Sequence, residues 1–176
     1  MKPVLAATAT AIDIPTDASI KLNLQDPDSM TLDPEGNIVL DSQADQELIF
    51  VSDPGATNQR VLRLPLSFET ASGPMPIEVD DTAFVTSTEG FILFADKGLN
   101  AVFALKKTAF VPGTAYTAAD GGPFIGTIDL TSGVITPIVT GVQNPGGMVF
   151  VDTTRRGGDL GEETGESCRE RGGDPH

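Results

Sequence analysis

Histidine and cysteine are almost absent from this chain of 176 residues. The only histidine is His176, the last residue, and the only cysteine is Cys168. A single cysteine excludes an intramolecular disulfide. A Ser-His-Asp triad, a Cys-His pair and a histidine-based zinc site all need an ordered imidazole. A terminal histidine can hardly supply one, so these classes of catalytic site are not expected.

Basic residues and long apolar runs are also scarce. Lysine and arginine number 11 against 25 aspartates and glutamates, so the net charge is −14. Binding of nucleic-acid phosphates needs clustered lysine and arginine, so nucleic acid is not expected as a partner. No run reaches the roughly 18 apolar residues of a membrane span. The acidic surface instead fits solubility, repulsion between copies or cation binding.

The abundant residue types favour β-strands. Glycine (19 residues) and proline (13 residues) are abundant, and valine, isoleucine, leucine and phenylalanine occur in short runs. Such a composition predicts many turns and short β-strands rather than long helices. The length suffices for one globular domain with a hydrophobic core.

An internal repeat organises the middle of the chain. The segment 26–36 can be laid over 80–90 without a gap at an offset of 54, and 144–150 begins a third copy 64 residues further on. Each copy opens with an aspartate or asparagine, continues with a small residue and then has a large apolar residue. These positions are Asp26, Asp80 and Asn144; Ser29, Ala83 and Gly147; and Met30, Phe84 and Met148.

Further strands are expected after each copy. The turn Asp33–Gly36 predicts a hairpin from the first copy into 37–40, and Glu89-Gly90 predicts the same from the second copy into 91–94. Third strands are expected at 48–51 and 101–105, and fourth strands at 60–64 and 124–130. Gly133 predicts a hairpin into 134–139. The residues 110–123 look like an insertion loop.

Four short strands in each unit of about 40 to 50 residues are typical of β-propeller blades. A β-sandwich is the alternative, because it also shows evenly spaced strands. Ungapped self-similarity favours the propeller. We therefore predict an all-β propeller fragment over residues 25–152, with about two four-stranded blades and the first strand of a third.

The stretch Leu32–Ser42, with the sequence LDPEGNIVLDS, resembles the blade pattern of NHL-repeat proteins and of SMP-30/gluconolactonase/LRE-like six-bladed propellers. Thr127–Gly133 resembles the outer hairpin of such blades. The resemblance implies a six-bladed fold, and a closed ring would need about 250 to 320 residues. Lactonases of this group bind a divalent cation through Glu, Asn and Asp side chains of several blades, and no such set matches here residue by residue.

Two terminal segments are set apart. Residues 1–24 end in the alternating run Ile20–Leu24, which predicts the outer strand of a preceding blade, and their first eleven residues fit either a weak signal peptide or a disordered start. Residues 153–176 are rich in glycine, glutamate and arginine, with Leu160 the only aliphatic hydrophobe from Arg155 onward. Such a tail is expected to be disordered. It fits a natural acidic tail, a truncation or a reading-frame change equally well.

Two sets of polar residues are candidate sites. In a propeller the inner strands line a channel, so Asp26, Asp80 and Asn144 would form a ring able to bind a hard cation such as Ca²⁺. The loop pairs Asp41/Asp45 and Asp96/Asn100 offer the same chemistry. The alternative for both sets is an Asx turn, in which the side chain caps its own backbone.

Two functions remain open from the sequence. The first is a non-catalytic propeller module with a binding or scaffold role towards a protein or small-molecule ligand. The second is a metal-dependent lactonase or hydrolase of the SMP-30/gluconolactonase-like group, with most of its active site outside this chain. Whether the protein is an enzyme is therefore undecided. Exposed blade edges predict self-association, and the acidic charge and N-terminus predict an extracytoplasmic location.

Overall fold

The computed structural model describes residues 3–120 and 122–154, and these residues form strands joined by loops. No helix within this part of the chain could cross a membrane. In chain order the strands are β1 (Thr10–Asp13), β2 (Ala18–Lys21), β3 (Pro27–Leu32), β4 (Ile38–Ser42), β5 (Glu47–Ser52), β6 (Arg60–Pro65), β7 (Ser67–Thr70), β8 (Gly73–Pro76), β9 (Val79–Phe84), β10 (Gly90–Asp96), β11 (Ala101–Leu105), β12 (Ala115–Ala119), β13 (Phe124–Ile128), β14 (Val134–Thr140) and β15 (Pro145–Asp152).

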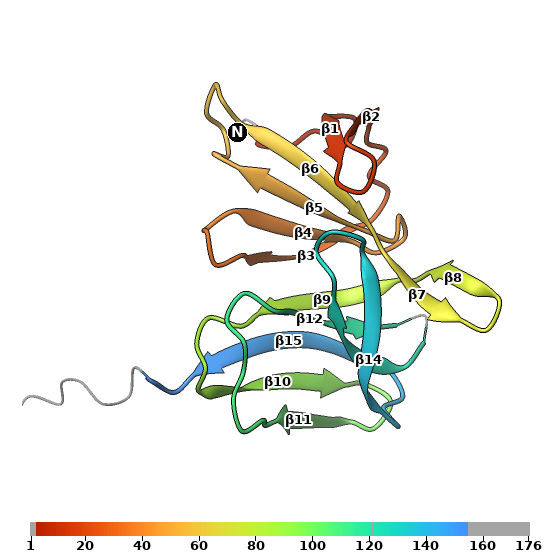
Figure 1. Ribbon diagram of the computed structural model, residues 1–176, viewed down its shortest axis with the longest axis vertical. Coiled ribbons are helices and arrows are strands. Elements are labelled where there is room, and N and C mark those ends of the chain that lie inside the picture. The colour runs from red at the N-terminus through yellow and green to blue at the C-terminus, as the bar shows by residue number, and fades with distance from the viewer. Residues whose placement is uncertain (1–2, 121, 155–176) are drawn as a thin grey trace, which may run out of the picture.

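The strands form three sheets. The first sheet has the order β2-β1-β6-β5-β4-β3, the middle sheet β8-β7-β14-β13-β12-β9, and the third sheet β11-β10-β15. In Figure 1, β9 and β12 lie between the first sheet and the third. One edge strand of each sheet, namely β3, β9 and β15, carries a copy of the sequence repeat, and β9 contacts both others. We call these three the inner strands.

Each sheet is held by apolar side chains on the faces that meet its neighbour. Successive residues of a strand point to opposite faces. In β5, Leu48 and Phe50 therefore join the core between the first and middle sheets, whereas Ile49 and Val51 point to the other face. The core between the middle and third sheets contains Tyr116 from β12, together with Ile92, Phe94 and Met148 from the third sheet.

The sequence repeat has a structural counterpart. Every inner strand is antiparallel to its partner and shows a register shift near its N-terminal end, where a β-bulge interrupts the ladder. The shifts fall between Pro27 and Met30, between Val79 and Asp81, and between Gly146 and Met148. The three copies therefore share a backbone feature as well as a residue pattern.

Several sequence-based predictions are confirmed. The fold is all-β, the turn Asp33–Gly36 joins β3 to β4 with Leu32 opposite Ile38, and Gly133 lies in the hairpin that sets Ile128 opposite Ile135. The run Ile20–Leu24, predicted as the outer strand of a preceding blade, lies partly in β2, which belongs to the first sheet through β1 and the parallel pairing of β1 with β6. The predicted tail, from residue 155 onward, lies outside the described residues.

The predicted hairpin from the second copy is wrong. Strand β9 pairs with β12, which lies inside the expected insertion loop 110–123, and β10 pairs with β11 and β15. Strand β15, which carries the third copy, therefore pairs with β10, a strand that precedes it in the chain. The reason is that Phe91–Phe94 is apolar at every position, so alternation does not select a partner for β10. The middle sheet uses β12 and β13 in place of the expected β10 and β11.

Arginine 63 connects three strands of the first sheet. From β6 its Nη1 lies 2.9 Å from a carboxylate oxygen of Asp13 in β1, and its Nε donates to Glu47 in β5. Both carboxylates are buried, with 6% of each residue exposed. Removing the guanidinium would leave two buried charges without a counter-ion.

We expect Arg63→Met to lower the free energy of unfolding by about 3 kcal/mol. Removing one partner of a buried ion pair leaves the other charge buried and unpaired. Arg60→Met is the matched control, since Arg60 begins the same strand and is exposed. Its effect should stay within about 0.5 kcal/mol. Urea unfolding at neutral pH measures both values. Equal effects of the two substitutions would contradict the role given to Arg63.

Candidate functional site

A cluster of hydroxyl and carboxyl groups lies where the inner strands meet. It contains Ser29 from β3, Asp41 from β4, and Asp81 and Thr82 from β9. Asp41 is fully buried, at 0% exposure, and Thr82 is buried beside it. Buried polar groups need hydrogen-bond partners, so this cluster must satisfy itself internally.

The hydrogen bonds of the cluster are all satisfied only when one of its two carboxyl groups is protonated. The Thr82 hydroxyl donates to Asp41 Oδ1 at 2.7 Å. The Ser29 Oγ lies 2.9 Å from Asp41 Oδ2 and 3.0 Å from Asp81 Oδ1. A serine hydroxyl has one proton and can donate to only one of these carboxyl groups. The other contact is satisfied when that carboxyl group is protonated and donates to Ser29.

Asp41 is the group that carries this proton. Burial raises the pKa of Asp41 to about 7, more than the hydrogen bonds from Thr82 and Ser29 lower it, and the charge of Asp81 raises it further. Burial also raises the pKa of Asp81, but Asp81 accepts backbone hydrogen bonds from Met148 and Thr82 that favour its ionised form. Below about pH 7, the arrangement is therefore an Asp41 carboxylic acid, a Ser29 hydroxyl and an Asp81 carboxylate in series.

Asp81 connects the three sheets. Its Oδ1 is bonded to Ser29 of β3, and its Oδ2 accepts the backbone N–H of Met148 in β15. Its own backbone carbonyl accepts the Thr117 hydroxyl of β12 at 3.0 Å. An acid and a carboxylate in series could move a proton, but both groups bond to residues of neighbouring strands. We interpret the cluster as a clamp that positions the inner strands, and call it the Asp81 clamp.

The three residues predicted to ring a cation have different neighbours. Asp80 Oδ1 lies 3.0 Å from the Lys97 ammonium, and Asp80 Oδ2 accepts the Gly147 backbone N–H at 3.2 Å. A Cβ at Gly146 would lie 2.2 Å from Asp80 Oδ2, so a glycine is needed for this approach. Lys97 supplies the positive charge beside Asp80 that a cation would otherwise provide.

Lys97 contacts both Asp80 and Asn144, because its ammonium donates to Asp80 and its backbone N–H donates to the Asn144 carbonyl at 2.8 Å, whereas Asp26 lies apart from this pair. Asp26 is exposed, and its backbone carbonyl accepts the N–H of Gln43 at 3.0 Å. The side-chain oxygen of Asn144 is buried and has no hydrogen-bond partner within the described residues. Over residues 3–120 and 122–154, no three His, Cys, Asp or Glu side chains are grouped so that they could hold a metal ion.

Asp45 and Asp96 accept backbone N–H groups, as in the Asx-turn alternative. The N–H groups belong to segments distant in sequence as well as to nearby residues. Asp45 accepts the N–H of Gln25, directly before β3, at 2.8 Å. Asp96 accepts the N–H groups of Gln143 and Asn144, directly before β15, at 2.8 and 3.1 Å. Asp45 and Asp96, the last residue of β10, therefore each hold the chain that enters the inner strand of their own sheet. The partners lie 20 to 48 residues away in sequence, so local patterns did not reveal them.

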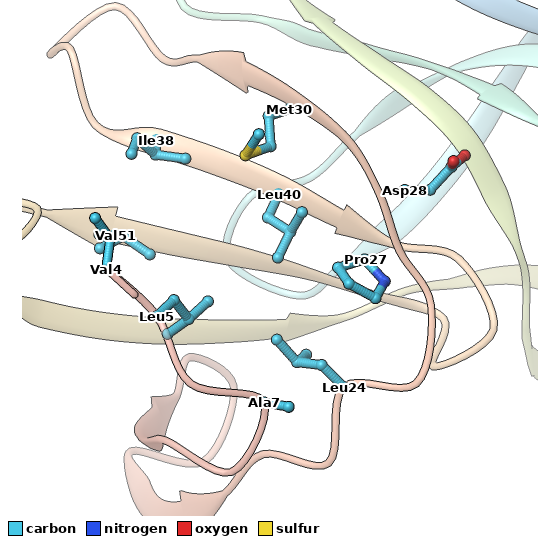
Figure 2. Close-up of a pocket in the computed structure, with 10 residues that line it drawn as sticks. All are labelled: Val4, Leu5, Ala7, Leu24, Pro27, Asp28, Met30, Ile38, Leu40 and Val51. Atoms are coloured by element: carbon cyan, nitrogen blue, oxygen red, sulfur yellow. The ribbon is translucent and has the colours of Figure 1, made fainter. Parts of the chain in front are cut away.

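An apolar groove of about 420 Å³ opens on the outer face of the first sheet. Figure 2 shows that its walls come from strands β3 to β5 and from the N-terminal segment beside them. Its apolar lining includes Val4, Leu5, Met30, Ile38, Leu40 and Val51, and Asp28 lies at one end. Met30 is 71% exposed although it occupies the large apolar position of the repeat.

No family model, curated protein or solved structure matches this chain. Its function is therefore inferred from the geometry of the clamp, the groove and the exposed faces.

The buried acid predicts a specific pH dependence. A carboxyl group whose pKa is higher in the folded state than in the unfolded state binds its proton more tightly when folded, so its contribution to stability is lost as pH rises. For Asp41 this loss falls between about pH 4 and pH 7. In Asp41→Asn, the amide would donate to Ser29 and accept from Thr82 as the protonated acid does.

We expect Asp41→Asn to gain stability relative to the wild type as pH rises from 4 to 8, by about 4 kcal/mol at most. Urea unfolding of both proteins at several pH values gives the difference, in which other titrating groups cancel. Asp45→Asn serves as the control, because hydrogen bonds from Ser42 and Gln25 lower the pKa of Asp45, so this substitution should show no such rise. A flat difference for Asp41→Asn would show that the pKa of Asp41 is the same in the folded and unfolded states, which would contradict the buried acid.

Proposed function

We propose that this chain is a non-catalytic, propeller-type interaction module that binds a protein partner through the outer faces of its first and third sheets. Three observations support the propeller arrangement. The inner strands share a bulge, the sheets meet face to face along β9, and Leu32–Ser42 resembles an NHL-type blade. In this arrangement the blades are β3-β4-β5-β6, β9-β12-β13-β14 and β15-β10-β11.

The exposed apolar faces carry the functional proposal. On the first sheet, Met30 and Leu32 are 71% and 59% exposed; on the third sheet, Val102 and Val149 are 70% and 51% exposed. Large apolar patches on a folded surface mark interaction sites. The polar cluster of the interior, in contrast, is fully engaged in joining strands, and Asp80 pairs with Lys97. These contacts favour binding over the metal-dependent hydrolase alternative.

Nile red, an uncharged dye that fluoresces in apolar surroundings, tests the binding role of the first-sheet face. We expect the folded chain at low concentration to enhance its emission, and Met30→Glu to reduce that enhancement by half or more. Ile138→Glu is the control, because Ile138 is an exposed apolar residue of β14 outside both faces. Absence of enhancement, or equal loss in both variants, would contradict the proposal. So would ester or lactone hydrolysis that Asp41→Asn abolishes.

A further inference from the structure

We infer that two copies of the chain pair through the outer backbone edge of β11, antiparallel to one another, so that their third sheets join into one continuous sheet. The inference goes beyond the proposed binding role, because it concerns the edge of a strand and not the outer faces of the sheets. It rests on a difference between β11 and the outermost strands of the other two sheets.

Strand β11 ends the third sheet. It pairs with β10 on one side, and among the described residues no strand pairs with its other side. In the first and middle sheets the corresponding strands, β5 and β13, are each followed by a further strand, β6 and β14. Figure 1 shows β11 as the outermost strand of its sheet. Alternate residues of β11 therefore turn their backbone N–H and C=O groups outward, where no described strand receives them.

The outermost strands of the other two sheets carry features that oppose further pairing. Strand β2 has only four residues and ends on Lys21, and β8 contains Pro74 and Pro76. Charged residues and prolines on an edge strand hinder its pairing with another chain. Strand β11 has the sequence Ala-Val-Phe-Ala-Leu, without charge, proline or register shift, and its three central residues are exposed. Its edge is therefore open to another strand.

The sequence of β11 is complementary to itself when two copies run antiparallel. In the register that pairs all five residues, Phe103 lies opposite Phe103 of the second copy. Ala101 then lies opposite Leu105, and Val102 opposite Ala104, so a small residue faces a larger one in both pairs. Phe103 already stacks on Phe94 of β10, with ring centroids 5.5 Å apart. The pairing would continue this row of aromatic rings from one copy to the next, and aromatic cross-strand pairs stabilise a sheet.

The charges around β11 permit this contact in a chain whose net charge is −14. No aspartate or glutamate occurs from residue 97 to residue 119. If the same register continues beyond the strand, Lys106 lies opposite Asn100 and Lys107 opposite Leu99, so no like charges are directly opposite. Both copies contribute the same strand, so the contact is two-fold symmetric and closes as a dimer.

Sedimentation velocity of the full chain tests the inference. One pair of short strands buries less area than a standard protein interface, so we expect a weak dimer, which is followed from about 10 μM to about 1 mM chain. Val102→Lys places a charge on the edge strand at a side chain that is 70% exposed. We expect this variant to keep the circular dichroism spectrum of the wild type and to raise the Kd of the dimer by at least about tenfold.

Val149→Lys is the matched control. Val149 lies on the same outer face of the third sheet as Val102, but on β15, at the opposite edge of the sheet. This variant should dimerise as the wild type does. Equal loss of the dimer in Val102→Lys and Val149→Lys would show contact through the outer face and overturn pairing through the β11 edge. A wild type that stays monomeric over the whole concentration range would overturn the second copy as partner.

Cross-linking locates the contact between the two copies. In a Cys168→Ser background, Phe103→Cys should give a covalent dimer with a short bis-maleimide linker, because residue 103 lies opposite itself in the inferred register. Val149→Cys in the same background should give none. A dimer that forms but does not cross-link at residue 103 would overturn the pairing of β11 with itself. The Nile red measurement reports on the outer faces alone, so failure of the binding role and failure of the edge pairing are distinguishable.

Discussion

The carboxylate of Asp81 is the contact on which the arrangement of the three sheets depends. One oxygen is bonded to Ser29 of β3 and the other accepts the N–H of Met148 in β15, while the residue itself belongs to β9. Asp81 is half-buried, and a carboxylate partly withdrawn from water loses stability when its hydrogen-bond partners are removed. The inner strands must therefore keep the spacing that satisfies Asp81, and the two apolar cores on either side of β9 form within that constraint.

The apolar cores and the polar clamp contribute differently. Burial of Phe84, Phe94 and their neighbours supplies most of the driving force, but apolar contact is not directional and tolerates sliding between sheets. Hydrogen bonds to Asp81 are directional and hold the inner strands in one register. The proton on Asp41 completes the network, because Ser29 can then donate to Asp81 while accepting from Asp41.

Local features of the fold could be predicted from the sequence, and distant ones could not. The Asp33–Gly36 turn and Gly133 determine their hairpins within a few residues. Strand β10 is apolar on both faces, so its partner depended on tertiary context. The equivalence of Asp26, Asp80 and Asn144 in the repeat suggested a shared site, but the sequence did not reveal that Lys97 bonds to the Asp80 carboxylate and to the Asn144 carbonyl while Asp26 is exposed. The partners of Asp81 lie 52 and 67 residues away in sequence, so no local pattern signalled the clamp.

Amide hydrogen exchange at Met148 tests the clamp most directly. In the wild type at neutral pH, the Met148 N–H donates to Asp81, and we expect it to exchange slowly. In Asp81→Ala this amide loses its acceptor, so its exchange should accelerate by at least about tenfold, whereas amides paired between β4 and β5 should change far less. An unchanged rate at Met148 in a folded Asp81→Ala protein would contradict the claim that Asp81 holds β15 against β9.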